Sequence, residues 1–173
     1  GYDFSFGNVI DFWVNHDKPE RIILNSYGGY LGEAIAITQH IRTYWADVPV
    51  YTIEAQSAAT LIHLAASPEN RYVAIDVIFM WHNMTGSFHG TADEMREYVL
   101  FLDKYRETII KEYAASTTAS EKQISDLMLD PPTYLTTEQI LSLGFASQTF
   151  ERESASIPDS FIAMKSDPIL MFK

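Results

Sequence analysis

The chain has 173 residues, no cysteine and a formal net charge of −11. This length suits one domain, over residues 1–173, with a sizeable core. The acidic balance argues against nucleic acid and anionic membranes as partners, and the lack of cysteine excludes disulfides and thiolate metal sites. No apolar run approaches the roughly 18 residues of a membrane span. No secretory leader opens the sequence, so we expect a cytoplasmic protein without a membrane anchor.

The first half of the chain alternates strand and helix patterns. A buried strand is expected where a compact apolar run precedes Gly28 and Gly29, and helical spacing resumes directly afterwards. In chain order the spacing predicts a helix over 4–14, a strand over 21–25, a helix over 31–45, a strand over 49–53, a helix over 57–66, and strands over 71–74 and 77–81. This order implies right-handed crossovers and a largely parallel sheet, which is an α/β fold.

The second half of the chain is mainly helical. Thr91 and Glu94 form a capping-box pattern that opens a long helix to about residue 115. Its apolar stripe is wider than a small core needs, so this helix either projects from the body or packs against another subunit. Two shorter helices over 120–129 and 136–143 and a last strand over 145–150 follow. We expect the tail over 151–173 to lie along the surface or along a neighbour.

Two strand-to-helix junctions carry the residues with chemical potential. Gly28 and Gly29 form either a simple tight turn or an oxyanion hole, in which glycines let backbone N–H groups approach a reacting carbonyl. The second junction is at residues 55–60, and both junctions lie where open α/β sheets bind ligands. His82 ends a further apolar run; by itself it fits a core histidine, but beside the junctions it fits a general base. No metal-ligand or phosphate-loop pattern is present, so no cofactor is expected.

Five segments in register resemble one known family. Residues 25–29 resemble its Asn-Ser-Pro-Gly-Gly, residues 55–60 its Gly-Gln-Ala-Ala-Ser-Met, and residues 79–82 its Val-Met-Ile-His. Residues 86–90 and the segment from Tyr134 to Phe145 supply further matches. The family is that of ClpP, the proteolytic subunit of the ATP-dependent Clp protease, in the crotonase-like superfamily. The resemblance covers about residues 21–150 and suggests a divergent, phage-encoded relative.

The resemblance implies a fold and a set of site residues. The fold would consist of repeated β-α-β units with a protruding handle, here residues 86–115. The chemistry would be that of a serine endopeptidase, a hydrolase. The implied site residues are the nucleophile position Ala59, the general base His82, the acid Asp130, the oxyanion donors Gly29 and Thr60, and the substrate-binding residues Gly28, Leu31, Thr85 and Ser87. The acid does not align with the family's, whose position falls on Pro132; Asp126 is a poorer candidate than Asp130.

Ala59 stands where the family has its serine, so the chain as written is expected to be inactive. An engineered Ser→Ala replacement is one explanation, and we favour it because the rest of the site is retained. A naturally non-catalytic ClpR-type ring subunit is the second. The third is a substitute hydroxyl from Ser57 or Thr60, which we disfavour because Ser57 lies two residues upstream and the side chain of Thr60 should diverge by roughly 100° from its neighbour's.

The resemblance also implies partners. It predicts heptameric rings of identical subunits, stacked in pairs as a tetradecamer around a closed chamber. An AAA+ unfoldase would feed unfolded proteins or peptides into this chamber. A crotonase-type acyl-CoA enzyme is a remote alternative, because oxyanion-binding N–H pairs also stabilise thioester enolates.

Overall fold

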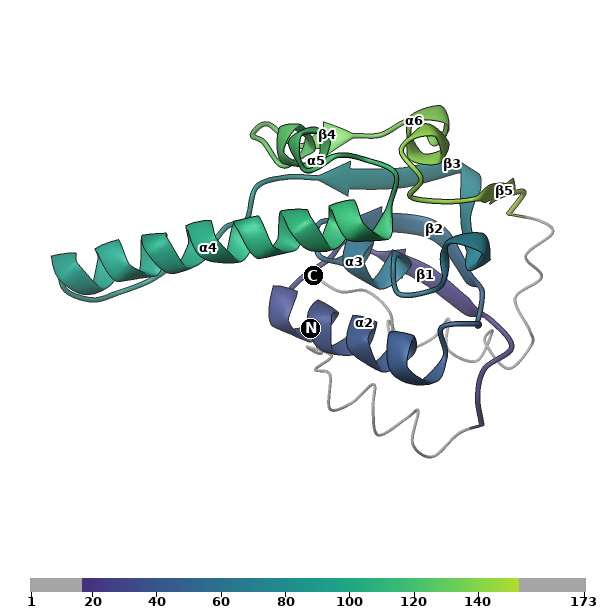
Figure 1. The fold of residues 1–173 in the computed structure, drawn as a ribbon, viewed down its shortest axis with the longest axis horizontal. Coiled ribbons are helices and arrows are strands. Elements are labelled where there is room, and N and C mark those ends of the chain that lie inside the picture. The colour runs from purple at the N-terminus through teal and green to yellow at the C-terminus, as the bar shows by residue number, and fades with distance from the viewer. Residues whose placement is uncertain (1–16, 153–173) are drawn as a thin grey trace.

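The computed structural model describes residues 17–152. Its centre is a sheet in which β1 (Ile22–Ser26), β2 (Val50–Gln56) and β3 (Arg71–Trp81) run parallel in that order (Figure 1). The far edge of β3 pairs with β5 (Gln148–Phe150), also parallel, and with the short antiparallel β4 (Thr133–Tyr134). The three long strands therefore end at one edge of the sheet, which is where the loops carrying residues 27–30, 57–58 and 82–85 begin.

Helices connect and cover these strands. Helix α2 (Leu31–Tyr44) links β1 to β2, and α3 (Ala59–His63) with the short 3-10 turn η1 (Pro68–Asn70) links β2 to β3. Helices α2 and α3 pack against each other, and α3 contacts β2 and β3. The core between them and the sheet contains fully buried apolar side chains, among them Ile41, Val50, Leu61, Phe79 and Phe145.

The long helix α4 (Ala92–Ser116) extends well beyond the body of the molecule (Figure 1). Thr91 caps it through a capping box with Glu94. Its buried residues are Ile109, Ile110 and Tyr113, all in the second half, whereas Leu100 in the first half is 67% exposed. The second half is therefore built into the core and the first half projects from it. Helices α5 (Glu121–Leu127) and α6 (Thr137–Ser142) follow, each with its own capping box.

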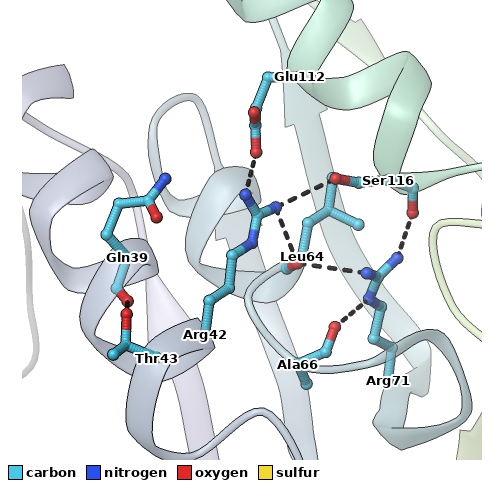
Figure 2. Close-up of polar contacts among 8 residues, drawn as sticks. All are labelled: Gln39, Arg42, Thr43, Leu64, Ala66, Arg71, Glu112 and Ser116. Carbon is cyan, nitrogen blue, oxygen red and sulfur yellow. Dashed lines mark hydrogen bonds and ion pairs between the residues drawn. The ribbon is translucent and has the colours of Figure 1, made fainter.

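Two arginines fasten the second half of α4 to the body (Figure 2). Arg42 of α2 forms an ion pair with Glu112 and donates to Ser116 Oγ at 3.1 Å. Arg71 is 3% exposed and donates to the carbonyl oxygens of Ala66 at 2.8 Å, of Leu64 at 3.3 Å, and of Ser116. Burial and the neighbouring Arg42 lower the pKa of Arg71 to about 10, so it stays charged at neutral pH.

The structure follows the expected order of elements and differs in detail. Residues 71–81 form one continuous strand rather than two, although its register against β2 shifts between Thr52 and Glu54. Helix α3 begins at Ala59 rather than at residue 57. The two-residue strand β4 was not expected, because so short a segment has no periodicity. The helix predicted over 4–14 and the tail beyond residue 152 lie outside the described residues.

Candidate active site

Ser57 occupies the turn between β2 and α3. Its φ of 53° lies in the left-handed region, where a residue with a side chain is uncommon and is held by its surroundings. The backbone N–H of Ser57 donates to the carbonyl oxygen of Met80 on β3 at 2.8 Å, which continues the pairing between the two strands for one residue. The sharp turn brings the Ser57 hydroxyl to the edge of the sheet at the end of β3.

His82 lies directly after β3 and contacts this hydroxyl. Its Nε2 is 2.8 Å from Ser57 Oγ, within normal hydrogen-bond distance. Because β2 and β3 are parallel neighbours, the residues that follow them meet at the same edge. Both side chains are partly exposed, so a molecule in the solvent can reach them. Within residues 17–152, no carboxylate hydrogen-bonds the imidazole of His82.

The turn after β1 packs against Ser57 from the other side. Gly28 is buried with φ at 88°, and its N–H donates to Ser26 Oγ at 3.2 Å. A β-carbon at this position would lie 2.5 Å from the carbonyl oxygen of Gln56, so no side chain fits. Glycine here lets the 28–29 backbone approach the Ser57 turn.

Two backbone N–H groups beside Ser57 have no acceptor in the described part of the protein, those of Gly29 and Ala58. Both residues line the same pocket as Ser57 and His82. The N–H of Thr60, in contrast, donates to the carbonyl oxygen of Ser57 at 3.1 Å. Thr60 is also 1% exposed, so it cannot donate to a bound molecule in this arrangement. The available pair of donors is therefore Gly29 and Ala58.

These groups open into one pocket between the sheet edge and α4. Tyr98, Phe101, Leu102, Tyr105, Ile109 and Tyr113 of α4 form its apolar wall, and the opposite wall comes from the loops after β1, β2 and β3. Of the expected substrate-binding residues, Leu31 and Thr85 line this pocket. Gly28 is a buried turn residue that does not line the pocket, and Ser87 is exposed and does not line it either.

Ala59 is not beside His82, although the resemblance places it at the nucleophile position. Ala59 is 1% exposed, belongs to the hydrophobic core and does not line the pocket. The side chain that contacts His82 is Ser57, two residues earlier. With Gln56 matched to the family's glutamine, the family's serine position falls on Ala59, two residues after Ser57. The signal for Ser57 in the sequence is that it is the first hydroxyl side chain after the strand, at the turn into the helix.

The remaining expected residue, Asp130, is exposed in the turn before β4 and makes no hydrogen bond to His82.

Over residues 17–152 there is no group of three or more His, Cys, Asp or Glu side chains that could hold a metal ion. In the same part of the chain, no helix is both long and apolar enough to span a bilayer.

Comparison with known proteins identifies similar chains. The family model described as Clp protease matches residues 13–153. The chain is 34% identical over 111 residues to ATP-dependent Clp protease proteolytic subunit 2 of Treponema denticola, covering 62% of this chain and 54% of that protein. It is 28% identical over 110 residues to the subunit of the same name from Pseudomonas aeruginosa, with 63% and 55% covered. The matched segment thus spans about half the length of these curated relatives.

The fold has a counterpart among solved structures. A ClpP1 mutant from Listeria monocytogenes superimposes with a TM-score of 0.71 at 23% identity, covering 86% of this chain and 83% of the other. At this identity the similarity shows a shared fold, a mixed sheet covered by helices.

Proposed function

This chain belongs to the Clp protease family, and we propose that it is a serine peptidase subunit whose nucleophile is Ser57. His82 acts as the general base, and the N–H groups of Gly29 and Ala58 form the oxyanion hole. The observation that carries the proposal is the 2.8 Å contact between Ser57 Oγ and His82 Nε2 at a left-handed turn facing a pocket. Nucleophiles on strained strand-to-helix turns are exposed in this way.

The reaction would proceed by acyl transfer. Ser57 Oγ attacks the carbonyl carbon of the scissile peptide bond while His82 Nε2 takes the hydroxyl proton. The carbonyl oxygen becomes an oxyanion and accepts hydrogen bonds from the two N–H groups, each worth roughly 3–4 kcal/mol of barrier. His82 then gives its proton to the leaving amine, which departs and leaves an acyl-enzyme ester. A water molecule deprotonated by His82 hydrolyses this ester and restores Ser57.

We propose Asp130 as the third member of a catalytic triad with Ser57 and His82. In the antiparallel pairing of β3 and β4, Trp81 lies opposite Thr133, so the turn at residues 130–132 begins beside residue 82. A carboxylate there would accept a hydrogen bond from His82 Nδ1–H and fix the tautomer that leaves Nε2 free to accept a proton. Asp130 is the carboxylate of that turn.

We further propose that the subunit acts inside a ring. The first half of α4 carries exposed apolar side chains, with Val99, Leu100 and Phe101 each more than half exposed. This supports the role of residues 86–115 as a handle between subunits of heptameric, stacked rings. Peptides or unfolded proteins are the proposed substrates, an AAA+ unfoldase the proposed partner, and the cytoplasm the proposed location.

The proposal for Ser57 changes the explanation of Ala59. An engineered Ser→Ala replacement and a naturally non-catalytic subunit both require residue 59 to face His82, and a hydroxyl at Ser57 makes neither necessary. The Ser57–His82 pair also favours peptide hydrolysis over the acyl-CoA alternative. Stabilising a thioester enolate needs only the N–H donors, whereas covalent acyl transfer needs a nucleophile with a base beside it.

Cleavage of a short fluorogenic peptide tests the proposal. We expect the unaltered chain to cleave it and Ser57→Ala to abolish cleavage. The double variant Ser57→Ala with Ala59→Ser separates the two assignments of the nucleophile, because it should stay inactive if Ser57 is the nucleophile. Recovery of cleavage in the double variant would contradict the assignment.

A further inference from the structure

We propose that Thr60 is a positioning residue, and that its hydroxyl, held by Tyr113, aims the Ala58 N–H into the oxyanion hole. This inference rests on the proposed function of Ser57. Thr60 Oγ1 donates to the carbonyl oxygen of Ser57 at 2.6 Å. The same oxygen atom of Thr60 lies 2.6 Å from the hydroxyl of Tyr113, which comes from α4.

The direction of these two hydrogen bonds follows from the number of protons. A threonine hydroxyl has one hydrogen to donate and can also accept. Because that hydrogen is used toward the carbonyl of Ser57, the Tyr113 hydroxyl must be the donor toward Thr60. The chain therefore runs from Tyr113 O–H to Thr60 O–H to Ser57 C=O. Such chains polarise each link, so the Tyr113 bond strengthens the one to Ser57.

The carbonyl of Ser57 and the N–H of Ala58 belong to one peptide group. A peptide group is planar and trans, so its C=O and N–H point in opposite directions. Holding the carbonyl on Thr60 therefore fixes the direction of the Ala58 N–H. Thr60 lies in the core at 1% exposure, whereas Ala58 lines the pocket. The N–H is thus directed away from the core, toward the pocket side of the turn.

The positions of Thr60 and Tyr113 leave them little freedom. Both are almost fully buried, Tyr113 at 3% exposure, and Tyr113 packs on Trp81 with ring centroids 4.1 Å apart. Burial raises the pKa of Tyr113, which keeps its hydroxyl protonated and able to donate. Trp81 directly precedes His82. Tyr113 thus supports both halves of the site, the Ser57 turn through Thr60 and the end of β3 through Trp81.

If Thr60 is a positioning residue, removing its hydroxyl should weaken binding of the transition state and leave substrate binding nearly unchanged. Thr60→Val keeps the shape of the side chain and removes the hydroxyl; we expect kcat on a short peptide to fall about tenfold, with KM changed less than about twofold. Affinity for a peptide boronate, whose tetrahedral adduct places an oxygen in the oxyanion hole, should fall by a similar factor. Thr60→Ser should retain kcat within about twofold, and Tyr113→Phe should lose about threefold, because Thr60 keeps its own hydrogen bond.

The controls separate this proposal from the one on which it rests. Tyr72→Phe deletes a hydroxyl at the other end of β3 and should leave kcat unchanged. Full kcat and boronate affinity in Thr60→Val, or a rise in KM alone, would overturn the positioning role while Ser57 stays the nucleophile. If Thr60→Val does not fold, an undiminished kcat in Tyr113→Phe overturns the role instead. Cleavage that survives Ser57→Ala overturns both proposals.

Discussion

The backbone of Gly28 lies so close to Ser57 that a β-carbon on residue 28 would be 2.8 Å from Ser57 Cβ. The same atom would be 3.0 Å from the N–H nitrogen of Ala58. The contact joins the turn after β1 to the turn after β2, and it brings the Gly29 N–H to the same pocket as Ala58. Gly28 therefore has no room for a methyl group, whereas Gly32, four residues later, has nothing within 4 Å of an added β-carbon.

Gly28→Ala should disrupt the site. The methyl group would clash with backbone atoms of Gln56 and Ala58, and residue 28 would have to leave its φ of 88°. We expect peptide cleavage to fall by more than about 100-fold, in the range seen on loss of an oxyanion donor. Gly32→Ala is the matched control: nothing lies within 4 Å of the added methyl, and the residue is in helix α2. It should keep activity and raise the free energy of unfolding by about 0.5–1 kcal/mol, measured in urea. Equal activity of the two variants would contradict the packing argument.

The sequence predicts most of the fold and misses one decisive torsion angle. Strands β1, β2 and β3 and helices α2 and α4 follow from apolar periodicity, because burial on one or both faces determines where apolar residues recur. The motif at residues 55–60 also points to the junction at which Ser57 and His82 meet in the structure. What periodicity does not contain is the left-handed φ of Ser57, which delays the start of α3 to Ala59 and turns the hydroxyl toward His82. That geometry depends on contacts with Met80 and Gly28, which are distant in sequence.

The buried His63 predicts a pH-dependent stability. Its Nε2 lies 2.9 Å from the carbonyl oxygen of Phe145 and must donate to it, so Nδ1 accepts from Thr52 Oγ1 at 2.7 Å. Burial lowers its pKa from 6.5 to about 3. The folded state therefore favours neutral His63, and its contribution is complete above pH 6.5 and is lost as the pH falls from there toward pH 3.

Urea unfolding over this pH range tests the prediction. Between the pKa of His63 in the unfolded chain and its pKa in the folded protein, the free energy of unfolding should decline by about 1.4 kcal/mol per pH unit as the pH falls. His63→Gln keeps an N–H for Phe145 but does not titrate, so it should show a flatter dependence. His89→Gln, at an exposed position, should behave like the unaltered chain. The account of His63 fails if the His63 and His89 variants have the same pH dependence.

Arg71 should be hard to replace even by lysine. Its guanidinium serves three backbone carbonyls from Leu64, Ala66 and Ser116, in a fork that a single ammonium group cannot reproduce (Figure 2). We expect Arg71→Lys to lower the free energy of unfolding by about 2–4 kcal/mol, because buried carbonyls lose their donors. Arg96→Lys, on the projecting half of α4 where the side chain is 71% exposed, should change it by less than about 0.5 kcal/mol. Thermal or urea unfolding distinguishes them, and equal stabilities would contradict the argument.

Asp130→Asn tests the proposed third member of the site. Loss of the carboxylate should lower kcat by at least about 100-fold, because the imidazole of His82 would no longer be held in the required tautomer. Asp126→Asn is the matched control, since Asp126 is exposed and pairs with Lys122 within α5 at 2.6 Å. It should retain full kcat. A reduced kcat in the Asp126 variant together with an unaffected Asp130 variant would move the third member to residue 126.

The most direct measurement is the identity of the residue that reacts with a fluorophosphonate probe. The probe phosphonylates an activated serine, and peptide mapping by mass spectrometry locates the modified residue. We predict modification at Ser57, its loss in His82→Ala because the hydroxyl then has no base, and no modification of Ser57→Ala. Modification at another serine, or none in a chain that cleaves peptides, would contradict the assignment of Ser57 and His82 as the reacting pair.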